Sequence, residues 1–372
     1  MSDGRATPRR AKGSAGTQGS SATTLERDGL RDLAVRVEAR LERFFDAEVS
    51  RWVRLQPELR ELIDVLATLT LSGGKRLRPA FCYWAFVGSG GDPVDPQIID
   101  AGAGLELLHT ALLIHDDLID DASLRRGIET SHVRFAARHR EHGWAGPSDR
   151  FGSNVAVLLG DLAIFYAYGL LSGAPPPARH LFQQLGVEVG LGQYLELVTT
   201  AEDRRDYAAA RLIARYKSGK YTIERPLQLG AALAGQLDQL EPLSAYGLPL
   251  GEAFQLCDDL LGVFGDSAVT GKPVGSDLRQ GKCTVLMATA QRRATGARAI
   301  QLLARVGDPS IDERTLTEIQ TVLIDSGARR EVEELRDALV EEALTALERV
   351  RLTAPARQAL TALAGVATRR VS

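Results

Sequence analysis

Apolar residues recur at spacings of three and four along most of this chain, which is the period of an amphipathic α-helix. Leu30, Leu33, Val37, Leu41 and Phe44 set the pattern. Alternation of apolar and polar residues, the mark of a half-buried strand, is almost absent. The helical spacing predicts further helices, separated by glycine, proline or short polar breaks, at 58–71, 79–88, 97–121, 152–172, 178–200, 207–234, 240–264, 283–305, 312–326, 329–350 and 354–369. The pattern therefore predicts an all-α fold.

Two of the helical segments, 101–114 and 155–171, are apolar on nearly every side. A helix of this kind belongs at the centre of a bundle, where none of its faces meets water. The length of 372 residues allows two domains, but no linker interrupts the succession of helices after residue 30. We therefore expect a single large helical bundle over 29–372.

Residues 1–28 are rich in Gly, Ser, Thr and Ala and carry Arg9, Arg10 and Lys12. They contain no apolar run of the kind that a secretory signal needs, so we expect a disordered tail. The most apolar stretch, 155–171, is interrupted by Asp161 and followed by three prolines. It falls short of the ~18 to 20 uninterrupted apolar residues of a membrane helix. No integral membrane segment is expected.

The chain carries 45 Lys and Arg against 48 Asp and Glu, a net charge of −3. This balance argues against an ordinary basic nucleic-acid-binding protein. With 44% hydrophobic and 25% charged residues, the composition is that of a soluble globular protein. Cys82, Cys257 and Cys283 show no CxxC or Cys/His spacing, so neither a disulfide framework nor a zinc site is predicted, and a reducing cytoplasm fits best.

The most informative segment is the helix that ends in HDDLIDD at 115–121. Asp116 and Asp120 are four residues apart, as are Asp117 and Asp121, so each pair shares a helix face where like charges repel. Four acids also oppose the dipole at a helix C-terminus. A solvated helix end is the simplest alternative, but the preceding turns are apolar and divalent cations would neutralise the cluster. Carboxylate oxygens suit Mg²⁺, which shares its remaining positions with substrate phosphates.

A second acidic pair, Asp258 and Asp259, follows another apolar helical run far along the chain. Either cluster alone is a weak indication of function. On two core helices, however, the clusters can face each other across a bundle and hold several metal ions around one polyanion. The pattern therefore indicates a diphosphate ligand.

Cations accompany both acidic clusters. The string GGKRLRP at 73–79 places three of them beside flexible glycines, which can cradle an anion or form an ordinary basic turn. Arg125 and Arg126 follow the first cluster, either as phosphate ligands or as counterions of the aspartates. His109 lies about two turns before Asp116, although a lone histidine on an apolar helix is usually a core residue. Further ammonium groups come from Lys217, Lys220, Lys272 and Lys282.

In this order, the strings resemble the trans-polyprenyl diphosphate synthase family, the all-helical head-to-tail prenyltransferases. The resemblance covers approximately residues 30–370. It rests on GGKRLRP at 73–79, HDDLID followed by RRG at 115–127, GQYLEL at 192–197, KSG at 217–219, and FQLCDDLLG with TGK and GK at 254–282. It implies the isoprenoid synthase fold, a helical bundle around a central apolar cavity, and a homodimer.

The resemblance also assigns roles to the residues that match the family motifs. The implied substrates are isopentenyl diphosphate and an allylic prenyl diphosphate, with about three Mg²⁺ ions as cofactor. The implied metal ligands are Asp116, Asp117, Asp120, Asp258 and Asp259. Arg125, Lys217 and Lys272 match ligands of the allylic diphosphate, and Lys75, Arg78, His109 and Arg126 match the isopentenyl diphosphate pocket. Lys282 is added to the substrate-binding residues. By the resemblance, Gln193 and Gln255 line the region where the two substrates react. Lys217 and Ser218 lie near the carbon that becomes the allylic cation.

Two positions depart from the family pattern. Gly262 stands in place of the third aspartate of the usual DDxxD motif, and Glu196 stands where GQxxD has aspartate. Losing a carboxylate leaves one metal ion with fewer protein ligands, which a non-catalytic regulatory subunit would tolerate. Because DDxxG also occurs in similar, active bacterial synthases, we favour an enzyme. A class I terpene cyclase is least favoured, since its (N/D)Dxx(S/T)xxxE string is absent.

The implied reaction is ionisation of the allylic diphosphate, attack of the isopentenyl double bond on the cation, and loss of a proton, in a dry apolar tunnel. Tunnel depth should set product length. Positions 111 and 112 are Ala and Leu rather than the aromatic plug of relatives that stop at farnesyl diphosphate. Geranylgeranyl diphosphate is therefore the leading product. Farnesyl or longer products are the alternatives, since Phe165 or Tyr166 can close the tunnel at another depth.

Overall fold

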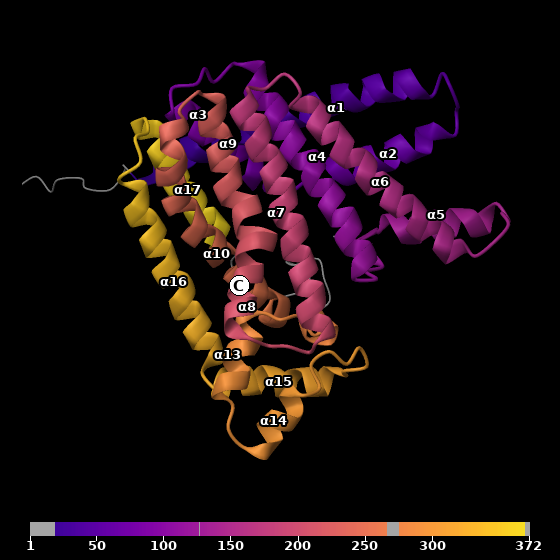
Figure 1. Cartoon of the computed structure of the whole chain (residues 1–372), viewed down its shortest axis with the longest axis vertical. Helices are drawn as coiled ribbons and strands as arrows, with labels where there is room; N and C mark the ends of the chain where they lie inside the picture. The colour runs from indigo at the N-terminus through magenta and orange to yellow at the C-terminus, as the bar shows by residue number, and fades with distance from the viewer. Residues whose placement is uncertain (1–18, 126, 266–274, 369–372) are drawn as a thin grey trace, which may run out of the picture.

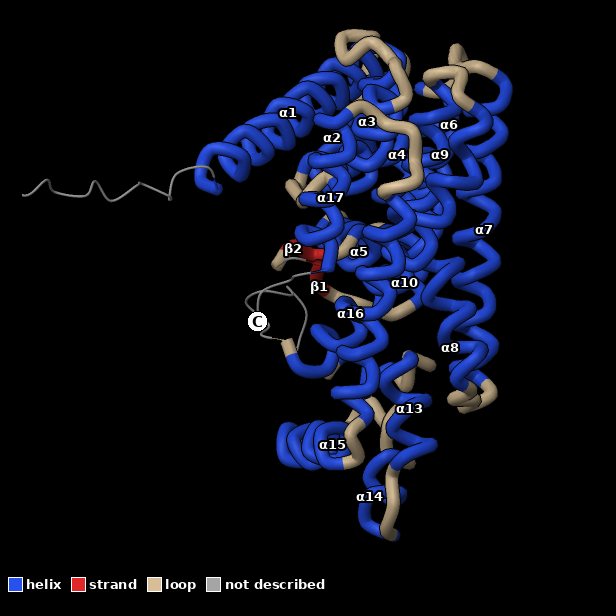
Figure 2. The backbone as a smooth tube through the Cα atoms, turned by 90° about the vertical axis from the view of Figure 1, so that its left-hand side faces the viewer, coloured by secondary structure: helices blue, strands red, loops and turns tan. Residues whose placement is uncertain are grey.

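The chain folds into an all-α bundle (Figure 1), which confirms the fold class that the hydrophobic spacing predicts. This computed structural model describes residues 19–125, 127–265 and 275–368. In those ranges the only strands are β1 (Leu124–Arg125) and β2 (Ile128–Glu129), an antiparallel pair that Figure 2 shows beside α5. The long helices are α1 (Gly19–Trp52), α4 (Pro96–Ile119), α6 (Ser148–Leu170), α7 (Pro176–Ala201), α10 (Leu240–Phe264) and α16 (Ala328–Leu347). The shorter ones are α2 (Leu59–Leu71), α3 (Leu77–Gly88), α5 (Ser131–Glu141), α8 (Tyr207–Ile213), η1 (Ala214–Glu224), α9 (Arg225–Leu233), η2 (Leu237–Gln239), α12 (Ser276–Gln280), α13 (Val285–Arg293), α14 (Ala297–Leu303), α15 (Glu313–Asp325) and α17 (Ala354–Thr368).

The two helices that end in acidic clusters, α4 and α10, both run through the interior. Helix α4 is buried along most of its length and packs against α6, α3 and α1. Helix α10 lies between η1 and α16. Burial of the apolar turns that precede each cluster holds the carboxylates at defined places inside the bundle rather than on its surface.

The buried side chains form two hydrophobic cores. The larger core joins α1–α4, α6, α7, α9 and the first half of α10, and the smaller one gathers around α13, α15 and the second half of α10. Figure 1 shows α14 and α15 at one end of the molecule, away from α1 and α2. Because Leu250 belongs to the larger core and Leu260 to the smaller one, the acidic pair of α10 lies where the two cores meet.

One predicted helix, 207–234, is three elements in the structure. Helix α8 is followed by η1, a π-helix, and then by α9. A π-helix has a wider turn than an α-helix and is frequently found at functional sites. The hydrophobic spacing of 207–234 does not distinguish η1 from a continuous α-helix.

Two other helix predictions need correction. The segment 283–305 is split into α13 and α14, because Gly296 adopts a φ of +89°, which a continuous helix does not allow. Helix α5 was missing from the prediction because basic and polar residues dominate it. Its buried residues His132, Phe135, Ala136 and His139 nevertheless follow helical spacing.

The expected disordered tail at 1–28 stays a prediction, because residues 1–18 lie outside the described residues. Helix α1 begins at Gly19. The part of α1 that packs in the core carries the buried residues Leu33, Val37 and Leu41. Once such a segment is helical, extending it costs less than starting a new helix, so the helix continues toward the N-terminus.

Two described helices, α4 and α6, are long and apolar enough to cross a membrane by length and composition alone. The apolar window of α4 is 72% buried inside the protein, so its composition reflects its place in the core. The window of α6 is only 28% buried, and Leu158 and Phe165 are exposed on it. Helix α6 therefore has an apolar face that the other described residues do not cover.

Candidate active site

A cavity of about 1600 Å³ lies between α3, α4, α7, η1 and α10. It brings together polar side chains that are far apart in the sequence. Those predicted from the sequence that line it are Lys75, Arg78, His109, Asp116, Arg125, Gln193, Lys217, Ser218, Gln255, Asp258, Asp259 and Lys282. Apolar side chains, among them Leu112, Leu113, Val189 and Phe254, line other parts of the wall. The cavity therefore combines a charged region with an apolar one.

Asp116 and Asp117, near the C-terminal end of α4, each lie against a cation. Arg125 on β1 donates from Nε to both carboxylate oxygens of Asp117 at 2.8 Å. Lys217 on η1 lies 3.2 Å from Oδ1 of Asp116 and also contacts Glu196 of α7. Burial alone would lower the pKa of Lys217, but Glu196 and Asp116 outweigh it and hold that pKa above its usual value. The buried ammonium group therefore stays charged at neutral pH.

Asp120, the next acid of this cluster, pairs with Lys282, whose Nζ lies 2.7 Å from Oδ2. The two residues are 162 positions apart in the sequence, so only the tertiary fold creates this contact. Burial would lower the pKa of Lys282, but the surrounding carboxylates raise it above its usual range. The side chain of Asp121 is exposed. Of the first cluster, Asp116 lines the cavity, whereas Asp117 and Asp120 adjoin it through Arg125 and Lys282, the lining cations that they contact.

Asp258 and Asp259 line the cavity from α10. Asp259 is 5% exposed and accepts a hydrogen bond from Nε2 of Gln255 at 2.7 Å. Burial raises the pKa of Asp259 to about 8; the bond from Gln255 lowers it, and the charges of Asp277 and Asp258 raise it. The raised pKa of Asp259 means that burial and the neighbouring carboxylates disfavour its ionised form. A cation placed beside it would stabilise the ionised form.

Lys217 reaches its carboxylates because η1 packs backbone to backbone against its neighbours. A Cβ atom on Gly192 of α7 would lie 2.4 Å from the backbone nitrogen of Lys217. On the other side, a Cβ on Gly251 of α10 would lie 2.5 Å from the carbonyl oxygen of Gly219. Only glycine permits approaches this close. The glycines on α7 and α10 therefore set the depth at which Lys217 and Ser218 enter the cavity.

A buried ion network fixes the C-terminal part of η1. Arg225 donates to Glu188 of α7 from Nε at 2.7 Å and from Nη2 at 2.6 Å, and Nζ of Lys220 lies 3.0 Å from the same carboxylate. Burial would raise the pKa of Glu188, but the hydrogen bonds from Arg225 and Lys220 outweigh it and hold the pKa below its usual value. Lys220, one of the ammonium groups expected near the second acidic cluster, therefore belongs to this structural network.

Arg76, the middle cation of the basic turn at 73–79, also has a structural place. Its backbone adopts a left-handed φ of +48°. The guanidinium contacts Glu106 and Glu38 and donates to the carbonyl oxygen of Thr70 at 3.1 Å. Arg76 also lines the cavity, but two carboxylates already neutralise its guanidinium, so its charge belongs to the fold around the turn.

Arg78 and His109 meet at Tyr221, which the sequence analysis did not single out. The Arg78 guanidinium lies 4.1 Å from the centre of the Tyr221 ring and donates to Oγ1 of Thr222 at 3.0 Å. The Tyr221 hydroxyl contacts Nδ1 of His109. His109 therefore faces the cavity rather than the core. The available signal was spacing, since Tyr221 follows Lys217 by about one helical turn.

Some expected contributors do not line the cavity. Phe165 on α6 is 73% exposed, and the ring of Tyr166 packs against Phe44 of α1, with ring centres 5.0 Å apart. Neither side chain closes the apolar part of the cavity. Arg126 and Lys272 lie outside the described residues, and their roles remain predictions.

The oxygen-rich lining suits a hard divalent cation. Among the described residues, no three acidic, histidine or cysteine side chains converge closely enough to hold a metal ion by themselves. Mg²⁺ typically takes one or two carboxylates and completes its coordination with water and substrate phosphates. Asp116 on one wall and Asp258 and Asp259 on the other supply carboxylates in this way, and Asp120 adjoins the cavity beside Lys282. The residues therefore fit metal ions that bind together with a phosphorylated ligand.

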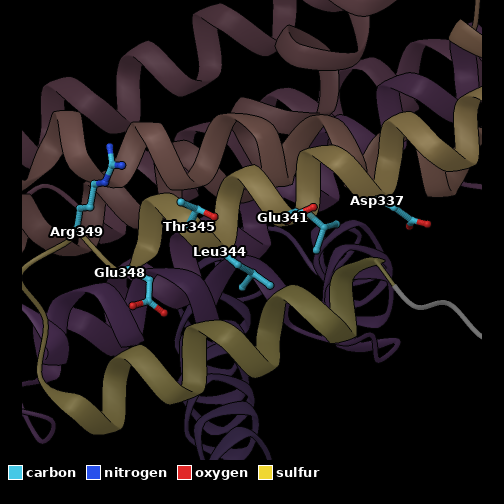
Figure 3. Close-up of a pocket in the computed structure, with 7 residues that line it drawn as sticks. Asp337, Glu341, Leu344, Thr345, Glu348 and Arg349 are labelled. Carbon is cyan, nitrogen blue, oxygen red and sulfur yellow. The ribbon is translucent and has the colours of Figure 1, made fainter.

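A second hollow, on the outer face of α16, offers no comparable chemistry (Figure 3). Its seven lining residues, among them Asp337, Leu344 and Arg349, all come from α16 and the two residues after it. Figure 3 shows their side chains spread along the helix rather than converging on one point. The large cavity is therefore the candidate active site.

Comparison with known proteins places this geometry in a family. Residues 59–323 match the family model described as polyprenyl synthetase. The chain is 31% identical over 292 residues to the geranylfarnesyl diphosphate synthase of Aeropyrum pernix, covering 76% of this chain and 85% of that protein. It is 30% identical over 286 residues to the nonaprenyl diphosphate synthase of Mycobacterium tuberculosis, covering 77% and 78%. The geranylgeranyl pyrophosphate synthase of Corynebacterium glutamicum, solved with isoprenyl diphosphate and magnesium, superimposes with a TM-score of 0.88 at 35% identity, over 92% of this chain and 99% of that one.

Proposed function

This chain belongs to the polyprenyl synthetase family of head-to-tail prenyltransferases, and we propose that it condenses isopentenyl diphosphate with an allylic prenyl diphosphate to form geranylgeranyl diphosphate. One observation carries the proposal. Carboxylates of α4 and α10 line the same cavity as Lys75 and Arg78, so a site for a metal-bound diphosphate adjoins a second anion site. A reaction between two diphosphate esters needs this arrangement.

We assign the first diphosphate to the space between Asp116, Asp120, Asp258 and Asp259. Divalent metal ions bound there would neutralise the charge that develops on the departing diphosphate. Two solved relatives support this assignment, since the Corynebacterium glutamicum enzyme is complexed with isoprenyl diphosphate and magnesium and the polyprenyl synthase of Caulobacter crescentus with isoprenyl diphosphate and calcium. The raised pKa of Asp259 gives an independent reason, because burial beside other carboxylates favours a bound cation.

The cations of the first cluster bind the same diphosphate. Arg125, Lys217 and Lys282 pair with aspartates here, and each has further N–H donors that can reach phosphate oxygens. Because they are held before the substrate arrives, they stabilise the leaving group without reorganising during the reaction. Lys272, which lies outside the described residues, is proposed to join them by its place in the family motif.

Isopentenyl diphosphate occupies the second anion site. We assign its diphosphate to Lys75, Arg78 and His109, with Arg126 added by resemblance. The contact between the Tyr221 hydroxyl and Nδ1 of His109 fixes the orientation of the imidazole. The ring of Tyr221 packs against the Arg78 guanidinium. Holding both esters in place converts an encounter of two molecules into a step within one complex.

The apolar wall protects the allylic cation from water. Leu112, Leu113 and Phe254 line it, and Gln193, Gln255 and Ser218 contribute polar atoms to the same cavity. No aromatic side chain stands at position 111 or 112. Neither Phe165 nor Tyr166 reaches the cavity. These features favour a tunnel deep enough for geranylgeranyl diphosphate.

The test of activity is turnover of the purified chain with isopentenyl and farnesyl diphosphates in Mg²⁺, with products separated by chain length. We expect geranylgeranyl diphosphate as the main product. No turnover would instead favour a regulatory subunit, and cyclised hydrocarbons would favour a terpene cyclase. Failure to elongate farnesyl diphosphate, or elongation well beyond one unit, would reject the proposed product.

A single substitution tests the proposed product length. Leu112→Phe places an aromatic ring in the cavity wall, where it would shorten the space for the growing chain. We expect this variant to release farnesyl diphosphate from isopentenyl and geranyl diphosphates, with the overall rate largely retained. An unchanged product would show that position 112 does not limit the chain.

We further propose a cytoplasmic homodimer. Exposed apolar side chains gather on two long helices, with Leu158 and Phe165 on α6 and Val187, Leu191 and Tyr194 on α7. A monomer in water rarely exposes so many large apolar residues on its long helices. Sedimentation of the wild type and of Phe165→Glu tests the proposal. We expect a dimer and a monomer, respectively, and a monomeric wild type would refute it.

A further inference from the structure

Arg205, in the turn between α7 and α8, has a buried side chain. The side chain is 3% exposed, although the residues on either side of it are exposed. Nη1 donates to the carbonyl oxygen of Leu303 at 2.8 Å, and Nη2 donates to that of Val306 at 2.7 Å. Nη2 also donates to Oδ1 of Asp203 at 2.8 Å. The planar, forked guanidinium therefore ties this turn to the C-terminal end of α14.

The same end of α14 packs against the segment that carries Lys282. The N–H of Gly307 donates to the carbonyl oxygen of Leu278 in α12 at 2.8 Å. This N–H and the carbonyl of Val306 belong to one planar peptide group, so the bond from Arg205 on one side orients the bond to α12 on the other. A Cβ atom on Gly281 would lie 2.9 Å from the Cα of Gly307, which shows that the two backbones touch. Because Gly281 directly precedes Lys282, this contact sets the point from which the lysine side chain leaves the backbone.

A second contact joins the turn of Arg205 to the same segment. The thiol of Cys283 lies 3.9 Å from the carbonyl oxygen of Asp206, the residue after Arg205. Lys282 lies between the two contacts, and its Nζ reaches the cavity, 2.7 Å from Oδ2 of Asp120. The turn at 205–206 therefore holds the backbone on both sides of Lys282, through α14 on one side and at Cys283 on the other.

We propose that Arg205 is a positioning residue for the diphosphate site, because it holds in place the backbone from which Lys282 enters the cavity. Arg205 is not among the described residues that line the cavity, so it acts through Lys282. The inference rests on the proposed function, which assigns Lys282 to the departing diphosphate. It gives α14, which Figure 1 shows at the end of the molecule away from α1 and α2, a part in substrate binding without contact with the substrate.

The experiment measures binding rather than turnover. Farnesyl thiodiphosphate, an unreactive analogue of an allylic diphosphate, is titrated into the full chain in Mg²⁺ and followed by calorimetry. Arg205→Met keeps much of the apolar side chain and removes the guanidinium. We expect the analogue to bind about 10- to 100-fold more weakly, because a displacement of about 1 Å at a positioning group has an effect of up to about 100-fold. Arg204→Met is the matched control and should bind as wild type, since Arg204 is half exposed and forms a surface ion pair with Glu202 at 3.1 Å.

A double-variant cycle separates positioning of Lys282 from general support of the fold. In Lys282→Met, the side chain that Arg205 positions no longer binds the diphosphate. Adding Arg205→Met to that variant should therefore change the affinity for the analogue by less than about twofold, while urea denaturation still shows the loss of stability. Arg205→Lys keeps the charge without the fork, so its affinity should lie between those of the wild type and Arg205→Met.

Two results overturn the inference. One is wild-type affinity in Arg205→Met, and the other is an equal loss of affinity with Lys282 present and with Lys282 replaced. If Arg205→Met does not fold, Arg205→Lys takes its place in the cycle and the same two results decide. Failure of the wild type to bind the analogue in Mg²⁺ instead rejects the proposed function.

Discussion

Substituting Gly192 by alanine tests whether the contact between α7 and η1 sets the position of Lys217. The new Cβ would lie 2.4 Å from the backbone nitrogen of Lys217, 2.8 Å from its Cα and 2.8 Å from the carbonyl carbon of Tyr216. An ordinary van der Waals contact begins near 3.4 Å, so the two backbones must separate by about 1 Å. The neighbouring atoms belong to backbone, which cannot rotate away as a side chain would.

Two consequences have separate magnitudes. Overpacking of this kind costs about 1–3 kcal/mol of unfolding free energy. A displacement of about 1 Å at a group that positions the reacting atoms lowers turnover about 100-fold. Lys217 would be displaced from both Asp116 and Glu196, the carboxylates that it now contacts. We therefore expect Gly192→Ala to lose far more activity than its modest loss of stability explains.

Gly190→Ala is the stability reference, because a Cβ there meets no atom within 4 Å. Both glycines lie on α7, so both substitutions gain the helix propensity of alanine, about 1 kcal/mol. The difference between the two variants in urea denaturation then isolates the packing cost against η1. Steady-state kinetics at a temperature where Gly192→Ala remains folded gives the second readout. If Gly192→Ala matches Gly190→Ala in stability and matches the wild type in turnover, the reasoning about η1 is refuted.

Three further outcomes follow from the same geometry. Asp116→Ala should lower turnover by orders of magnitude while circular dichroism stays unchanged, because it removes a proposed metal ligand and not core packing; retained activity would count against the site. The pKa of Glu188 lies below its unfolded value of 4.5, so its stabilisation is present above that pH and lost as the pH falls through the folded pKa. Glu188→Gln should therefore lose less unfolding free energy than the wild type between about pH 6 and about pH 3. Arg76→Met leaves Glu106 buried without its partner and should cost about 3–5 kcal/mol in chemical denaturation, much of which Arg76→Met/Glu106→Leu should restore.

Local chemistry made much of the site predictable. The acidic clusters stand out because carboxylates at the ends of apolar helices need a cation, whatever the rest of the fold. Lys217 and Lys282 are also predictable from the sequence, because each lies in one of the recognisable motifs. Both reach the cavity, as the motifs indicate. Lys220 and Arg76 looked equivalent to these cations, but buried carboxylates elsewhere in the chain neutralise them.

The helical period, the order of the helices and the residue types that can bind a metal-bound diphosphate can be predicted from the sequence, because each depends on neighbours within a few turns. Which of those residues meet depends on how the helices pack. Helix η1 packs backbone to backbone against Gly192 and Gly251, and the side chain of Asp277 lies against Gly262. These positions depend on how closely helices distant in the sequence approach one another, and close packing between them leaves no periodic signal along the chain.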